Sequence, residues 1–131
     1  MRKFILLACL ALGLSACQES LEQRATREAR EFTEKKCPMP LGSDGKIVLE
    51  SIEFDIPTHT WRQHYLLNML PEAGPFDQAE ARRLLLDELR NSPSYQPYMD
   101  NGFIFHYIYR RMMSPNDTLL NLKLGPADYR N

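Results

Sequence analysis

The chain has 131 residues, of which 44% are hydrophobic and 25% are charged, and its formal net charge is −1. This length and hydrophobic content suit one domain that can form a core without disulfides or bound metal. The nearly balanced charge argues against a polybasic surface for nucleic acid or for anionic membranes.

The first 16 residues contain the parts of a secretory signal. Two basic residues precede an apolar run over residues 4–14, and the small residues Ser15 and Ala16 follow it. The run is shorter than the roughly 20 residues that a helix needs to cross a hydrocarbon core. We therefore expect residues 1–16 to be removed rather than kept as a membrane span.

The end of this signal is more specific. Leu14-Ser15-Ala16-Cys17 resembles the lipobox of bacterial lipoproteins, in which an aliphatic residue and two small residues precede a cysteine. The resemblance implies cleavage before Cys17 and attachment of acyl chains, such as palmitate, to this residue. Several acyl chains hold a protein stably at a membrane, whereas one binds only marginally. Gln18, in place of an aspartate, favours the outer membrane, with the domain facing the periplasm. The alternative is an ordinary signal peptide with a cysteine nearby.

Residues 18–36 carry many charges of both signs and contain no glycine or proline. A thin apolar stripe recurs at helical spacing, formed by Leu21, Ala25, Ala29 and Phe32. We expect a helix that docks through Leu21 and Phe32 or, alternatively, a solvated helical spacer. Pro38 and Pro40, which follow Cys37, end it.

Two strands are expected next, over residues 46–56 and 60–70, joined by a tight connection. Alternating apolar and polar side chains in both runs favour an antiparallel hairpin. The alternation slips between Leu49 and Ile52, which predicts a bulge or bend in the first strand.

The second half begins with the most secure helix, from Asp77 to Asn91, and continues through a loop to Gly102. Residues 103–110 carry apolar side chains on both faces, which predicts an interior strand, and residues 118–124 form a last strand. The order α-β-β-α-β-β predicts an α+β fold: an antiparallel sheet of about four strands in two hairpins with helices on one face. We divide the chain into a removed signal (1–16), a lipidated N-terminus with its charged helix (17–37) and the α+β domain (38–131).

No catalytic residue, metal site or cofactor is predicted. Cys37 is the one thiol left after cleavage and lipidation of Cys17. We expect it to be buried and unreactive, because free cysteine is among the most buried residue types and a helix C-terminus raises the pKa of a thiol. The alternatives are pairing with another chain and a reactive thiol. His59, His64 and His106 have no evident third ligand, so zinc is not expected. Serine-nucleophile, nucleotide-binding and zinc-protease motifs are absent from the sequence.

Aromatic side chains are numerous for a small domain. Most should belong to the core, but a minority could line an exposed sheet face or groove, where such rings give contact area at low entropic cost. The candidates for this binding surface are Trp61, Tyr95, Tyr98, Tyr107 and Tyr109.

The lipobox, Lys36-Cys37-Pro38 and the strand from Gly102 to Tyr107 resemble small uncharacterised lipoproteins of Bacteroides-like bacteria. That resemblance implies no activity. Our leading hypothesis is a non-enzymatic, membrane-anchored periplasmic module that binds a protein or peptide. The alternatives are an inhibitor or immunity-type lipoprotein that blocks an exported enzyme, and an enzyme that uses Cys37 or a histidine.

Overall fold

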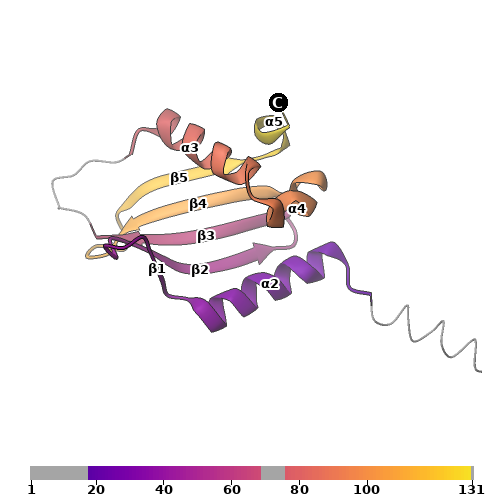
Figure 1. Cartoon of the computed structure of the whole chain (residues 1–131), viewed down its shortest axis with the longest axis horizontal. Coiled ribbons are helices and arrows are strands. Elements are labelled where there is room, and N and C mark those ends of the chain that lie inside the picture. Colours follow the sequence, from indigo (N-terminus) through magenta and orange to yellow (C-terminus); the bar gives the residue numbers. More distant parts are fainter. Residues whose placement is uncertain (1–17, 69–75, 131) are drawn as a thin grey trace, which may run out of the picture.

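The structure is a computed structural model that describes residues 18–68 and 76–130. The lipobox and Cys17 therefore lie outside the described residues, as do the last two positions of the strand expected over 60–70. Five strands form one sheet in the order β1-β2-β3-β4-β5. Figure 1 shows α2 running beside β2, α3 lying near β5, and α4 at the end of the sheet where β4 begins.

Helix α2 (Leu21–Lys36) begins at a capping box. The Ser20 hydroxyl accepts a hydrogen bond from the backbone of Gln23, whose side chain accepts one from the backbone of Ser20. The helix packs on the sheet mainly through Ala25 and Ala29, which are 0% and 2% exposed. Leu21 and Phe32 are only partly buried at the margins of this contact. The small alanine side chains let the helix approach the sheet closely, so α2 is part of the core and is not a solvated spacer.

The strands are β1 (Met39–Leu41), β2 (Ile47–Asp55), β3 (Thr60–Leu67), β4 (Ile104–Arg111) and β5 (Thr118–Leu124). The β2–β3 and β4–β5 hairpins are antiparallel as expected, and the register of β2 shifts between Leu49 and Ser51, where the sequence predicts a bulge. The α+β class is confirmed.

Two details of the predicted sheet are wrong. There are five strands because β1 adds an edge strand of three residues, too short for its alternation to be recognised. The sheet is mixed because β3 and β4 run parallel. The connection between them contains α3, η1 and α4, so the chain can cross to the other end of the sheet before β4 begins.

The prediction of a loop after α3 (Gln78–Arg90) is also wrong. This segment contains the 3-10 turn η1 (Pro93–Tyr95) and helix α4 (Gln96–Asp100). Each of these begins with a proline in its first turn, where the missing N–H group would have no intrahelical partner anyway. Proline therefore lies in the first turn of these helices and does not mark the loop that was expected from the sequence. A last short helix, α5 (Pro126–Tyr129), begins in the same way.

One hydrophobic core lies between the sheet and the helices. A row across four strands pairs Phe54 with Trp61, Trp61 with Phe105, and Phe105 with Leu124, which places the four side chains on one face. Helices α2, α3, α4 and α5 each add buried residues to this core: Ala25, Ala29, Leu89, Tyr98, Met99 and Tyr129. Helices α2 and α4 therefore share one core over the same face of β3.

Candidate binding site

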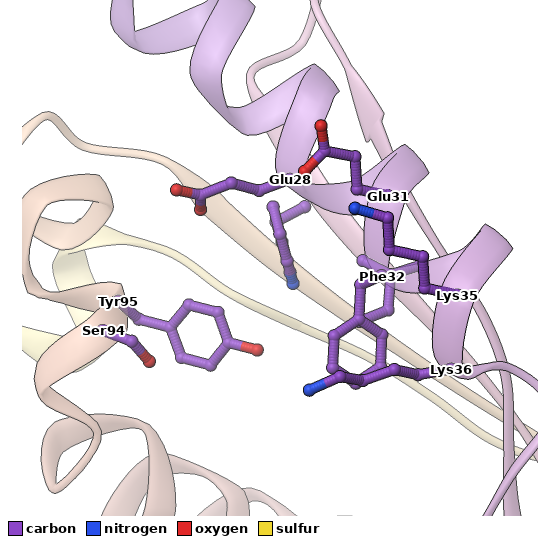
Figure 2. Close-up of a pocket in the computed structure, with 9 residues that line it drawn as sticks. Glu28, Glu31, Phe32, Lys35, Lys36, Ser94 and Tyr95 are labelled. Carbon is purple, nitrogen blue, oxygen red and sulfur yellow. The ribbon is translucent and has the colours of Figure 1, made fainter.

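A cavity of about 380 Å³ lies between the C-terminal half of α2 and the η1 turn. Figure 2 shows the Tyr95 ring on one side, with its hydroxyl pointing toward α2, and the α2 side chains on the other. The lining residues come from three places in the sequence: Glu28, Glu31, Phe32, Lys35 and Lys36 from α2, Ile52 and Trp61 from the sheet, and Ser94 and Tyr95 from η1. We call this cavity the Trp61 cleft.

Local structure places each wall. Glu28, Phe32 and Lys35 recur at spacings of three and four residues, so they share one face of α2. Trp61 belongs to β3, an interior strand hydrogen-bonded on both sides. Its ring packs against Tyr98 at 5.4 Å between centroids and edge-on against Tyr95 at 5.6 Å. The sheet and Tyr98 of helix α4 therefore hold the aromatic wall in place.

Trp61 carries an unsatisfied polar group. The residue is 4% exposed, and its indole Nε1 has no hydrogen-bond partner in the described part of the chain. The Tyr95 hydroxyl lies beside this N–H group. Burial raises the pKa of Tyr95, and the neighbouring Trp61 and Gln63 side chains offset part of that rise. The two groups nevertheless lack the geometry of a hydrogen bond. A buried donor without an acceptor costs about 1–3 kcal/mol.

The carboxylates at the rim of the Trp61 cleft already have partners. Arg24 Nε donates to Glu28 at 2.8 Å, and the Tyr98 hydroxyl donates to the same carboxylate. Burial alone would raise the pKa of Glu28, but these two hydrogen bonds hold it below its usual range. Glu31 lies 3.5 Å from Arg27, which pairs more closely with Glu19, at 2.6 Å.

The lysines at the rim have no carboxylate partner. Within residues 18–68 and 76–130, neither Lys35 nor Lys36 makes an ion pair. The Lys36 ammonium lies 5.3 Å from the centre of the Phe32 ring. Lys35 and Lys36 are therefore the charged side chains of the rim without a counterion in the described part of the chain.

The five aromatic residues predicted as a binding surface occupy different places. Trp61, Tyr98 and Tyr107 are buried, whereas Tyr95 and Tyr109 are partly exposed. The structure brings Trp61, Tyr95 and Tyr98 together at the cleft, but Tyr109 stacks on Tyr65 farther along the sheet, at 4.3 Å. Lys35, Lys36 and Ser94 also line the cleft but are not among the residues predicted for the binding surface. The spacing of Phe32, Lys35 and Lys36 along α2 is a signal that could have indicated the shared wall.

A second cavity, of about 330 Å³, lies between α3 and the sheet. Its lining is mostly apolar and includes Phe76, Leu84, Leu85, Tyr109 and Leu120. Phe76 directly follows residues 69–75, which are outside the described ranges.

Histidines and arginines form a hydrogen-bonded ladder on the sheet face opposite the core. Arg62 Nε donates to His106 Nδ1 at 2.9 Å, so His106 is neutral and its other nitrogen donates to Asn121 at 2.6 Å. Burial lowers the pKa of His106, with the positive charge of Arg62 contributing. His64 bridges Glu53 at 2.8 Å and Arg110 at 3.0 Å. These contacts give both histidines a structural role.

The remaining candidates for chemistry are not assembled into a site. Cys37 is partly buried at the end of α2, where burial raises the pKa of its thiol. His59 pairs with Glu22 at 3.5 Å. The described residues contain no group of three or more histidine, cysteine or acidic side chains placed to hold a metal ion. In the same ranges, no helix has the length and apolar character to cross a membrane.

Residues 20–120 match a family described as "Domain of unknown function (DUF8479)", which covers well over half of the sequence. The chain belongs to this family. No curated protein matches it.

Solved structures share the fold of this DUF8479 member. The pilotin EpsS of the Vibrio vulnificus type 2 secretion system matches with a TM-score of 0.64 and 13% identity, over 85% of this chain and 93% of that one. A protein from Pseudomonas aeruginosa described as secreted matches with a TM-score of 0.64 and 13% identity, over 86% of this chain and 100% of the other. The type II secretion system pilotin AspS of Vibrio cholerae matches with a TM-score of 0.58 and 12% identity, over 82% and 91%.

Proposed function

We propose that this chain is a lipid-anchored, non-enzymatic protein-binding domain of the pilotin kind, held at the outer membrane and facing the periplasm. The observation that carries the proposal is the likeness of fold to two pilotins over more than four fifths of this chain and nine tenths of theirs. The lipobox supports the membrane anchor. Acylated Cys17 would stand only three residues before Ser20, the N-cap of α2.

The side-chain chemistry supports binding rather than catalysis. Catalytic acids, bases and nucleophiles need pKa values tuned toward their task. Here burial raises the pKa of Cys37 and so disfavours its thiolate, while His64 and His106 are engaged in the ladder on the sheet face. An enzyme that uses Cys37 or a histidine has less support than a binding module.

The inhibitor hypothesis also has less support. An inhibitor that inserts into an active site would favour a segment projecting from the fold, for which residues 91–101 are the candidate. In the structure this segment forms η1 and α4, and it contributes buried Tyr98 and Met99 to the core. A segment packed in this way is not available for insertion.

The test is made in the organism that produces the protein. Outer-membrane proteins are quantified in a strain lacking the chain and after complementation with the wild type or with Cys17→Ala. We expect at least one outer-membrane protein to be lost from that membrane, and to return with the wild type but not with the unanchored variant. An unchanged outer-membrane proteome would contradict the pilotin role.

A further inference from the structure

We propose that the Trp61 cleft binds an acidic peptide segment of the partner protein. In this arrangement a carboxylate of the peptide accepts a hydrogen bond from the indole N–H of Trp61 and forms an ion pair with Lys35 or Lys36 at the rim. The inference rests on the proposed binding function and adds the place of binding and the chemistry of the ligand.

The first argument is the unsatisfied donor. Buried polar side-chain groups nearly always have hydrogen-bond partners, so an exception in a cavity wall calls for an explanation. Trp61 Nε1 is such an exception among the described residues, and it lies beside the hydroxyl of Tyr95, which points toward α2 in Figure 2. In the proposed complex the Tyr95 ring turns aside and exposes the donor to the ligand. The ligand must then supply an acceptor oxygen.

The second argument is charge. Glu28 and Glu31 are engaged by arginines of their own helix, whereas Lys35 and Lys36 are exposed and have no carboxylate partner in the described part of the chain. A basic segment would meet two ammonium groups that lack carboxylate partners, and carboxylates that already contact arginines. An acidic segment meets charges of opposite sign, and charge complementarity of this kind selects partners.

The third argument is the shape of the Trp61 cleft. Its volume of about 380 Å³ lies at the small end of the range for ligand pockets, enough for a few side chains and not for a whole domain. Phe32, Tyr95 and Trp61 supply apolar walls for the stem of a glutamate or for a neighbouring apolar residue. Because Trp61 is held by the sheet and by Tyr98, the aromatic wall is preorganised and little side-chain entropy is lost on binding.

Trp61 is the sole tryptophan of the chain, so its side chain reports directly on this site. We would record the indole N–H resonance by NMR while titrating the intact mature lipoprotein in detergent micelles. The probes are a pool of capped peptides in which glutamate alternates with apolar residues, and matched pools with glutamine or lysine in place of glutamate. We expect a saturable shift of the indole resonance with the glutamate pool and a much weaker response to the other two.

Two variants separate the parts of the proposal. Lys35→Gln combined with Lys36→Gln should weaken binding of the glutamate pool roughly three- to tenfold, the range expected for one or two exposed ion pairs. Lys46→Gln combined with Lys123→Gln is the matched control, because these lysines are also exposed but do not line the cleft. Trp61→Phe keeps a ring but removes the donor, and calorimetry should show weaker binding. If this variant does not fold, the lysine pair still tests the site.

Several outcomes would overturn the inference. A glutamine pool that binds as tightly as the glutamate pool would remove the charge argument. Inorganic phosphate that shifts the indole resonance as strongly as the peptides would assign the cleft to small anions or lipid headgroups. An indole resonance that no peptide pool moves would exclude the Trp61 cleft as the peptide site, and the membrane proteome would still decide the proposed function independently.

Discussion

Thr33 of helix α2 is hydrogen-bonded twice to the backbone of Ile52 in β2. Its hydroxyl donates to the Ile52 carbonyl at 2.8 Å and accepts from the Ile52 N–H at 2.9 Å. β1 pairs only with the first three residues of β2, so this edge of the sheet is open beyond Leu49. Thr33 takes the place of a neighbouring strand there. The contact sets the position of α2 on the sheet and with it the wall of the Trp61 cleft.

Thr33→Val should therefore destabilise the fold. Valine has nearly the same shape but leaves two backbone groups of Ile52 without partners, at a cost of about 1–3 kcal/mol in the free energy of unfolding. Urea denaturation measures the change. Thr26→Val is the control, because the Thr26 hydroxyl bonds only to Glu22 within the same helix. Equal midpoints for the two variants would show that the contact with Ile52 contributes no stability.

Leu89 and Leu84 lie on the same helix and provide a matched pair. Leu89 is 2% exposed in the core, whereas Leu84 is 54% exposed. We expect Leu89→Ala to lower the free energy of unfolding by about 2–5 kcal/mol because it leaves a cavity. Leu84→Ala should change it by about 0.5 kcal/mol or less. Similar losses for both would mean that α3 does not pack on the sheet in the way described.

His106 should make stability depend on pH. Because its pKa in the folded state lies below the ordinary value of 6.5, the unfolded chain binds more protons as the pH falls through that value. Stability should therefore be greatest above about pH 7 and decline toward about pH 5. His106→Gln should flatten the decline in unfolding free energy over this range. An unchanged slope would show that burial and the neighbouring Arg62 do not suppress protonation of His106.

Cys37 should react slowly with thiol reagents in the folded protein. Its thiol is partly buried, and burial raises its pKa, so little thiolate is present at neutral pH. Labelling should become fast once denaturant is added, which mass spectrometry follows with time. Cys37→Ser should leave peptide binding unchanged. Rapid labelling of the native protein, or a dimer lost on reduction, would revive a reactive role for Cys37.

The mature protein should begin at Cys17 and carry acyl chains there. Mass spectrometry of the membrane-extracted protein tests both points. Cys17→Ala removes the acyl acceptor and should leave uncleaved precursor. A mature N-terminus at any other residue, or an unmodified Cys17, would remove the lipid anchor from the proposed function.

Elements with strong local patterns were predictable from the sequence. Helix α2, the β2–β3 hairpin with its bulge, helix α3 and strands β4 and β5 all lie close to their expected positions. The physical reason is that amphipathic periodicity and turn residues are local signals. They can be recognised within a few neighbouring positions, without knowledge of distant parts of the chain.

Only the tertiary structure decided the rest. The parallel pairing of β3 with β4 depends on where the intervening helices return the chain, and no local period encodes that path. Pro93 could end a helix or begin one, and the packing of Tyr98 and Met99 into the core is consistent with the second outcome. The Trp61 cleft joins Lys35, Trp61 and Tyr95 from three distant segments. These residues line one cavity because Ala25 and Ala29 pack α2 closely against the sheet, and this contact between distant segments forms only when the chain folds.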